Sequence, residues 1–268
     1  MHIRLSKNLL AKYKAGVYKN YINDILNNIK HINGLGLKYP ANAKPVFYLY
    51  IVPDDNFKEL LGYPLSRAAS ITGSKPVTCY DLDGFNTALG MSSNYLENRG
   101  SINIMATVGN IHELAHLVHN MFFRAGEWFL AEGFAEALPL YVMDYENKFD
   151  KHREALKSLS KNQLLSAQQL MGFRTKDSFN GRPIIPNGYS GYDQSYISSY
   201  LFVRGCLEMI ADKFKLNRAQ ATQKLLEIIK FAGYGKQWLV MYLADQIGVS
   251  QKDLLEGTDM QFDVIKQL

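Results

Sequence analysis

The stretch from Gly109 to Leu138, GNIHELAHLVHNMFFRAGEWFLAEGFAEAL, constrains the fold more than any other part of the chain. It holds three of the six histidines together with four glutamates, and apolar residues surround nearly all of them. Apolar residues at helical spacing predict helices that pack into a core, where an unpaired charge is costly to bury. The ionisable groups of this stretch therefore need partners.

The spacing of the first two histidines indicates a metal as that partner. His112 and His116 are four residues apart and lie on one face of a helix, so both imidazoles can point at a single ion. Two neutral imidazoles suit zinc, and the adjacent carboxylate of Glu113 can take a proton from a zinc-bound water. This His-Glu-x-x-His pattern is the metalloprotease signature. The alternative is a helix with two partly exposed histidines.

The second predicted helix offers a third ligand. Catalytic zinc needs three protein ligands, and Glu132 and Glu136 share one face of an otherwise apolar helix. One carboxylate can bind zinc while the other hydrogen-bonds the far nitrogen of a zinc-binding histidine. His119 is displaced along its helix from the first two histidines, so we expect a core or supporting histidine there. Glu127 is expected to open the second helix, whose N-terminus favours a negative charge.

The motifs HELAH and WFLAEGFAE resemble those of the gluzincin zinc peptidases, nearest to the M1-type aminopeptidases and the bacterial collagenases. The resemblance implies Zn²⁺ held by His112, His116 and Glu132, with Glu113 as general base and Glu136 supporting a ligand by hydrogen bonding. The interval from His116 to Glu132 is a few residues shorter than in M1-type or thermolysin-type enzymes. Counting from thermolysin selects Glu136 as the ligand instead.

Gluzincins commonly stabilise the oxyanion with a tyrosine or histidine from a later helix. The segment SYISSYLFVRGCLEMI resembles the one that carries this tyrosine, so we expect Tyr196 in the role, with Tyr192 as the alternative. Tyr189 and Tyr200 lie in the same segment. Tyrosines that serve only packing are the competing interpretation.

The resemblance also bears on the substrate, which we expect to be a peptide or protein. M1 aminopeptidases bind the free amine with a Gly-x-Met-Glu-Asn strand, whereas Gly90–Asn94 reads GMSSN and lacks the glutamate. An endopeptidase is therefore expected. The alternatives are an aminopeptidase or other zinc hydrolase on the same scaffold, or a non-catalytic domain that keeps the metal for stability or binding.

Periodicity predicts an α+β fold with the thermolysin-like architecture that the resemblance implies. Residues 1–106 are expected to hold an N-terminal helix and a small mixed sheet, and residues 107–268 a helical subdomain, with the zinc cleft between them. The expected strands are Lys44–Asp55, Ala69–Thr72, Val77–Tyr80, Asn86–Met91 and Ser101–Met105. The expected helices include Ser6–Ile32, Val108–Phe123, Glu127–Tyr145 with a kink at Pro139, Gln194–Phe214, Arg218–Phe231 and Lys236–Gly248. The long segment Gly172–Asp193 is a candidate lid.

Composition limits the partners and the compartment. The chain is 47% hydrophobic with a modest net charge of +5, which predicts a globular protein and no nucleic-acid binding. We also expect a monomer. No apolar run reaches the length of a membrane span, and no signal peptide is visible. Cytoplasmic, non-classically exported and processed secreted forms stay open.

Overall fold

The computed structural model describes residues 1–5, 7–41, 47–52, 77–80, 87–92, 96–97, 104–122, 128–172, 194–232 and 236–268. The chain divides into two compact units, Met1–Met121 and Phe122–Leu268. The boundary expected after residue 106 lies within one continuous helix, α6 (Ile104–Phe122).

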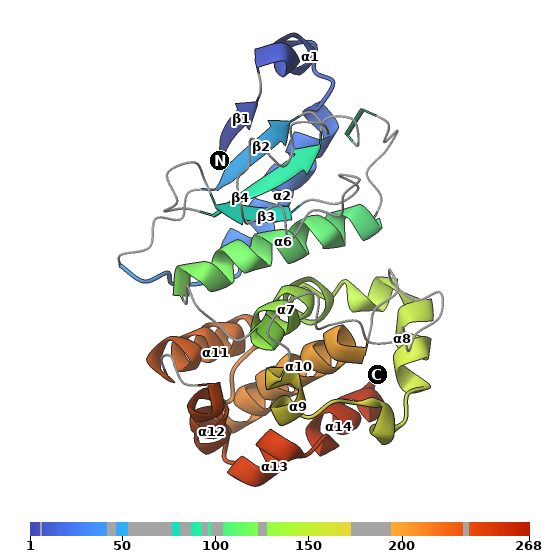
Figure 1. Ribbon diagram of the computed structural model, residues 1–268, viewed down its shortest axis with the longest axis vertical. Helices are drawn as coiled ribbons and strands as arrows, with labels where there is room; N and C mark the ends of the chain where they lie inside the picture. Colours follow the sequence, from blue (N-terminus) through green and yellow to red (C-terminus); the bar gives the residue numbers. More distant parts are fainter. Residues whose placement is uncertain are drawn as a thin grey trace. The chain divides into compact units, whose positions relative to one another are not determined.

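The first unit contains a four-stranded mixed sheet with the order β1-β2-β4-β3 (Figure 1). Its strands are β1 (His2–Leu5), β2 (Tyr48–Val52), β3 (Val77–Tyr80) and β4 (Thr87–Ser92). β2 is parallel to both β1 and β4, and β3 is antiparallel to β4. Leu49 and Ile51 are fully buried, which places the β-branched and leucine residues of the central strand in the core. β1 was not expected from the sequence.

The N-terminal helix is interrupted where the sequence predicted one helix over Ser6–Ile32. A 3₁₀ turn, η1 (Lys7–Leu9), precedes α1 (Leu10–Lys14), and α2 runs over Lys19–Gly34. Gly16 lies between α1 and α2 with a φ of 80°, a left-handed conformation that ends the first helix. α2 buries an apolar face that includes Tyr21, Ile25 and Ile32.

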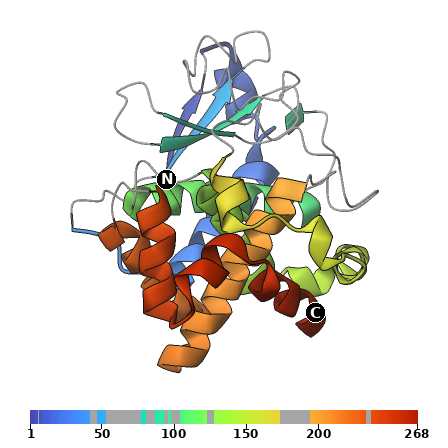
Figure 2. The same cartoon turned by 60° about the horizontal axis from the view of Figure 1, so that its bottom comes forward.

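In the part of the second unit that the structure describes, every regular element is a helix or a helical turn. α10 (Gln194–Phe214) runs through its middle and packs against α7 (Trp128–Ala137), α11 (Arg218–Ala232) and α14 (Asp259–Gln267) (Figure 1 and Figure 2). The remaining elements are η3 (Glu146–Lys148), α8 (Asp150–Lys157), η4 (Lys161–Gln163), α9 (Ala167–Met171), α12 (Lys236–Ile247) and α13 (Gln251–Glu256).

Pro139 ends the regular helix that was predicted over Glu127–Tyr145. α7 stops at Ala137, and the chain continues as a π-helical turn, η2 (Leu138–Val142). The wider turn is visible in the backbone bond from the Met143 N–H to the Leu138 carbonyl, at 2.9 Å. Proline has no N–H to donate and its ring crowds the preceding turn, so the α-helical bonding pattern is lost there.

The α+β prediction is contradicted, because the described residues are mostly helical and the sheet is small. In its secondary-structure content, the described part of the chain is closer to an all-α protein. One expected strand, Ser101–Met105, is wrong in its described residues: Ile104 and Met105 are the first residues of α6. Helix propagation from the long apolar segment that follows outweighs the weak strand propensity of this short run. The expected strand Ala69–Thr72 lies outside the described residues.

Among the helices that the structure describes, none combines the length and the apolar character needed to cross a bilayer.

Candidate metal centre

Helix α6 brings two imidazoles to one point. The Nε2 atoms of His112 and His116 are 3.2 Å apart, and the two rings are nearly perpendicular at 84°. Two nitrogens that bind one tetrahedral zinc at about 2.05 Å lie roughly 3.3 Å apart. Both side chains are half-buried. The pair therefore has the separation that two ligands of one zinc ion need.

The first turns of α6 are attached to α2 by a polar network within the first unit. The Asp24 carboxylate accepts hydrogen bonds from Thr107 Oγ1 at 3.0 Å and from Asn110 Nδ2 at 2.7 Å. The Tyr21 hydroxyl donates to Asn110 Oδ1 at 3.1 Å. Asn110 is buried and lies two residues before His112. The network thus holds the helix that carries both histidines in one orientation against α2.

Helix α7 carries both candidate carboxylates. Glu132 is half-buried, and Glu136, one turn later, is only 3% exposed. Between them, Gly133 permits a close approach of α10: a Cβ at this position would lie 2.3 Å from the Ser199 carbonyl oxygen. The glycine of the AEGFAE segment is therefore required by helix packing.

The ligand atoms of His112, His116 and Glu132 all lie within 4.8 Å of one another, so this group can hold a metal ion. The group includes neither Glu136 nor His119, among the residues that the structure describes. Two imidazoles and one carboxylate suit zinc with an open fourth position, and the same donor set also suits Fe(II). Glu113 follows His112 on α6 and is half-buried.

The other residues expected to have a role lie outside this group of three. His119 is 1% exposed, as expected of a core histidine. Tyr196 is half-buried in the first turn of α10. Glu127, Tyr189 and Tyr192 lie outside the described residues, as does the candidate lid apart from Gly172.

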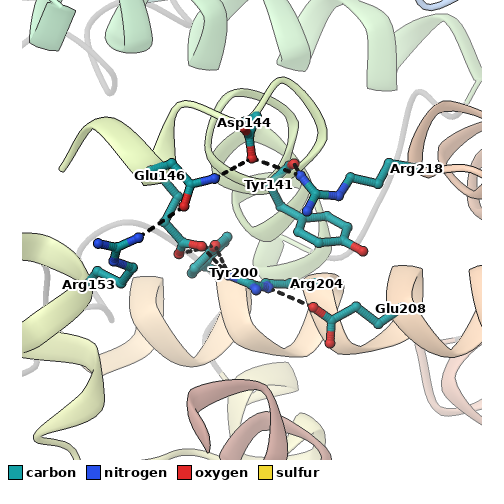
Figure 3. Close-up of polar contacts among 9 residues, drawn as sticks. Tyr141, Asp144, Glu146, Arg153, Tyr200, Arg204, Glu208 and Arg218 are labelled. Atoms are coloured by element: carbon teal, nitrogen blue, oxygen red, sulfur yellow. Dashed lines mark hydrogen bonds and ion pairs between the residues drawn. The ribbon is translucent and has the colours of Figure 1, made fainter. Parts of the chain in front are cut away.

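Tyr200 has a partner that sequence reasoning missed. Its hydroxyl donates to Glu146 Oε1 at 2.7 Å and accepts a hydrogen bond from Arg204 Nη1 at 3.1 Å (Figure 3). Arg204 Nη1 also donates to Glu146 Oε2 in a buried ion pair. The available signal was the four-residue spacing of Tyr200 and Arg204 on an apolar helix. Because its hydroxyl is committed to Glu146, Tyr200 is unsuited to stabilise an oxyanion.

A further buried histidine lies near Glu136 and Glu146, two buried glutamates of this unit. His152 on α8 is 4% exposed. Burial lowers the pKa of His152 below its ordinary value, and the nearby carboxylates of Glu146 and Glu136 partly oppose this shift. His152 is therefore neutral near pH 7.

No family model, curated protein or solved structure matches this chain in comparisons with known proteins.

Proposed function

We propose that this chain is a zinc-dependent peptidase in which His112, His116 and Glu132 hold the metal. One observation carries the proposal: the ligand atoms of these three residues lie within 4.8 Å of one another, and Glu113 directly follows the first of them. A half-buried carboxylate beside the ligands favours hydrolysis, because hydrolysis needs a base and a purely structural zinc site does not. Hydrolysis by this mechanism also favours zinc over Fe(II) as the bound metal.

The residues of the chain have separate proposed roles. Bound zinc would supply Lewis acidity toward a water molecule and a peptide carbonyl. Glu113 takes the proton of the attacking water and then delivers it to the leaving amine. Tyr196 donates a hydrogen bond to the oxyanion. Glu136 supports a ligand histidine by hydrogen bonding. The motif resemblance to gluzincins supports this assignment.

The metal and its third ligand are tested by metal analysis. We expect about one zinc ion per wild-type chain purified without added metal, clear loss of zinc in Glu132→Ala, and retention in Glu136→Ala with weaker affinity. Zinc lost from Glu136→Ala but kept in Glu132→Ala would make Glu136 the ligand. Iron in place of zinc, or no metal after zinc is offered, would remove the proposal.

The general base is tested by removing its charge alone. Glu113→Gln should keep its zinc while hydrolysis of quenched fluorogenic peptides falls by roughly 10²–10⁴-fold, the range that one general base contributes. Glu154→Gln, the same change at an exposed glutamate on α8, is the control and should retain wild-type activity. Equal activity in Glu113→Gln and the wild type would contradict the mechanism.

Endopeptidase activity is the finer part of the proposal, since GMSSN lacks the amine-binding glutamate of M1 enzymes. Acetylated and free N-termini distinguish the two classes: an endopeptidase cleaves both kinds of peptide, whereas an aminopeptidase requires the free amine. Bound zinc without hydrolysis across a broad peptide library would instead indicate a metal-stabilised binding domain.

A further inference from the structure

Three side chains in the second unit form a closed polar cluster, which we name the clamp: Glu146, Tyr200 and Arg204. Both carboxylate oxygens of Glu146 are occupied, one by the Tyr200 hydroxyl at 2.7 Å and the other by Arg204 Nη1. The side chains of Glu146 and Arg204 are each only 8% exposed. Burial raises the pKa of Tyr200 well above its ordinary value, and the Glu146 charge adds to the shift, so the hydroxyl stays a donor.

The clamp lies on the same face of α10 as Tyr196. Tyr196, Tyr200 and Arg204 follow one another at intervals of four residues, so they form one stripe along the helix. Arg204 Nε extends this stripe by donating to Glu208 Oε1 at 2.9 Å (Figure 3). A rotation of α10 that displaced Tyr200 from Glu146 would therefore displace Tyr196 as well.

The partners of this stripe come from the chain that directly follows α7. Tyr141 of η2 lies beneath the Arg204 guanidinium, 4.9 Å from the carbon atom to the ring centroid, and Glu146 opens η3. α7 itself touches α10 at the Gly133–Ser199 contact, where a side chain has no room. Ser199 lies between Tyr196 and Tyr200 in the sequence, and Gly133 is next to Glu132. These contacts therefore fix the rotation of α10 relative to α7, the helix that carries the proposed third ligand.

We propose that the clamp of Glu146, Tyr200 and Arg204 is a positioning device, which holds α10 in the one rotation that presents Tyr196 for catalysis. This inference rests on the proposed peptidase function. The three residues bond to one another in a buried cluster, so they act through Tyr196 as positioning residues. A displacement of about 1 Å at a catalytic group can cost on the order of 100-fold in rate. Leaving one charge of a buried pair without its partner supplies ample energy for such a displacement.

A double-mutant cycle on kcat tests the inference, with the quenched peptide that the wild type cleaves fastest. Tyr196→Phe and Glu146→Gln should each lower kcat by roughly 10–100-fold, with KM and zinc content nearly unchanged. In the Tyr196→Phe background, Glu146→Gln should lower kcat by less than about 2-fold, because the group it positions is already gone. Independent losses that multiply, or a Tyr196→Phe variant with wild-type kcat, would overturn the inference.

Two further variants make the result decisive. If Glu146→Gln does not fold, Tyr200→Phe takes its place in the cycle, since it removes one hydroxyl and leaves the Glu146–Arg204 pair intact. Asp144→Asn is the matched control: Asp144 is an exposed carboxylate that pairs with Arg218 at 3.1 Å, and its kcat should equal that of the wild type. A wild type without zinc-dependent hydrolysis would reject the proposed function. An active wild type with a multiplicative cycle would reject the clamp alone.

Discussion

At the scale of single residues, the second unit buries several ionisable groups. The free-energy cost of burying each group is offset in a different way. Glu146 and Arg204 are buried together and neutralise one another. His152 is buried close to Glu146 and Glu136, and burial lowers its pKa, so it is buried as a neutral ring. A buried ion pair keeps its charges at neutral pH, whereas a buried histidine becomes a liability once the solution is acidic enough to protonate it.

His152 predicts a loss of stability in acid. Its pKa is lower in the folded protein than the ordinary value of about 6.5 in the unfolded chain. When the pH is above the pKa of the unfolded chain, the ring is neutral in both states, so its titration does not change the free energy of unfolding. As the pH falls through about 6.5, the unfolded chain binds a proton that the folded protein does not, so the free energy of unfolding decreases. One proton gives a slope of at most about 1.4 kcal/mol per pH unit.

Urea unfolding at pH 7.5 and pH 5.5 measures this effect, with metal removed by a chelator. The wild type should lose more stability between these two pH values than His152→Gln does, because the glutamine does not titrate. The other histidines titrate in both proteins and cancel in the comparison. An equal loss in the two proteins would show that His152 keeps its ordinary pKa.

At the scale of elements, helix contacts explain a residue of the motif that has no chemical role. Gly133 lies between Glu132 and Glu136 on α7, and glycine is a poor helix former. Glycine at this position allows the close contact between α7 and α10, because the Ser199 carbonyl occupies the space that any Cβ would need. Gly109 on α6 is a contrasting helical glycine, because nothing lies within 4 Å of the Cβ that could be added there.

The two glycines predict opposite effects of one substitution. Gly133→Ala should destabilise the folded protein by about 1–3 kcal/mol or more, because the methyl group forces α7 and α10 apart. Gly109→Ala should stabilise it by roughly 0.5–1 kcal/mol, because alanine favours the helix and meets no obstacle. Chemical denaturation of the chelator-treated variants measures both. A stable Gly133→Ala protein would mean that the helices separate at little cost.

At the scale of the whole molecule, metal binding should stabilise the folded chain. The two histidines and Glu132 come together only when the protein is folded, so the proposed zinc ion would favour the folded state. At a free zinc concentration 100-fold above the dissociation constant, the gain is about 2.7 kcal/mol. For a chain of this size, we expect the unfolding temperature to rise by about 5–10 °C.

Thermal unfolding with and without added zinc measures this gain. His112→Ala should lose the zinc-dependent shift, while His31→Ala, which removes an exposed histidine on α2, should keep it. A shift that survives in His112→Ala would place the stabilising zinc elsewhere in the molecule.

Apolar periodicity correctly predicted helices and strands that are determined by residues close together in the sequence. The apolar periodicity around His112 and His116 correctly indicated a helix, and Val77–Tyr80 is a strand as expected. The Ser6–Ile32 prediction missed the break at Gly16, because apolar periodicity runs through a glycine that the backbone uses to turn. The fold class was overturned because the described residues are mostly helical and the sheet is small. Short apolar runs also do not distinguish a strand from the beginning of a helix, which is why Ser101–Met105 was predicted as a strand.

That two imidazoles share one helix face follows from their spacing alone, since residues four apart meet in any α-helix. The sequence also narrowed the third ligand to Glu132 or Glu136. Only the tertiary structure brought the Glu132 carboxylate near both histidines and paired Glu146 with Arg204, 58 residues away. The reason is physical: a spacing of four is dictated by the backbone's own hydrogen bonds, whereas distant partners meet only through the packing of helices such as α7 and α10.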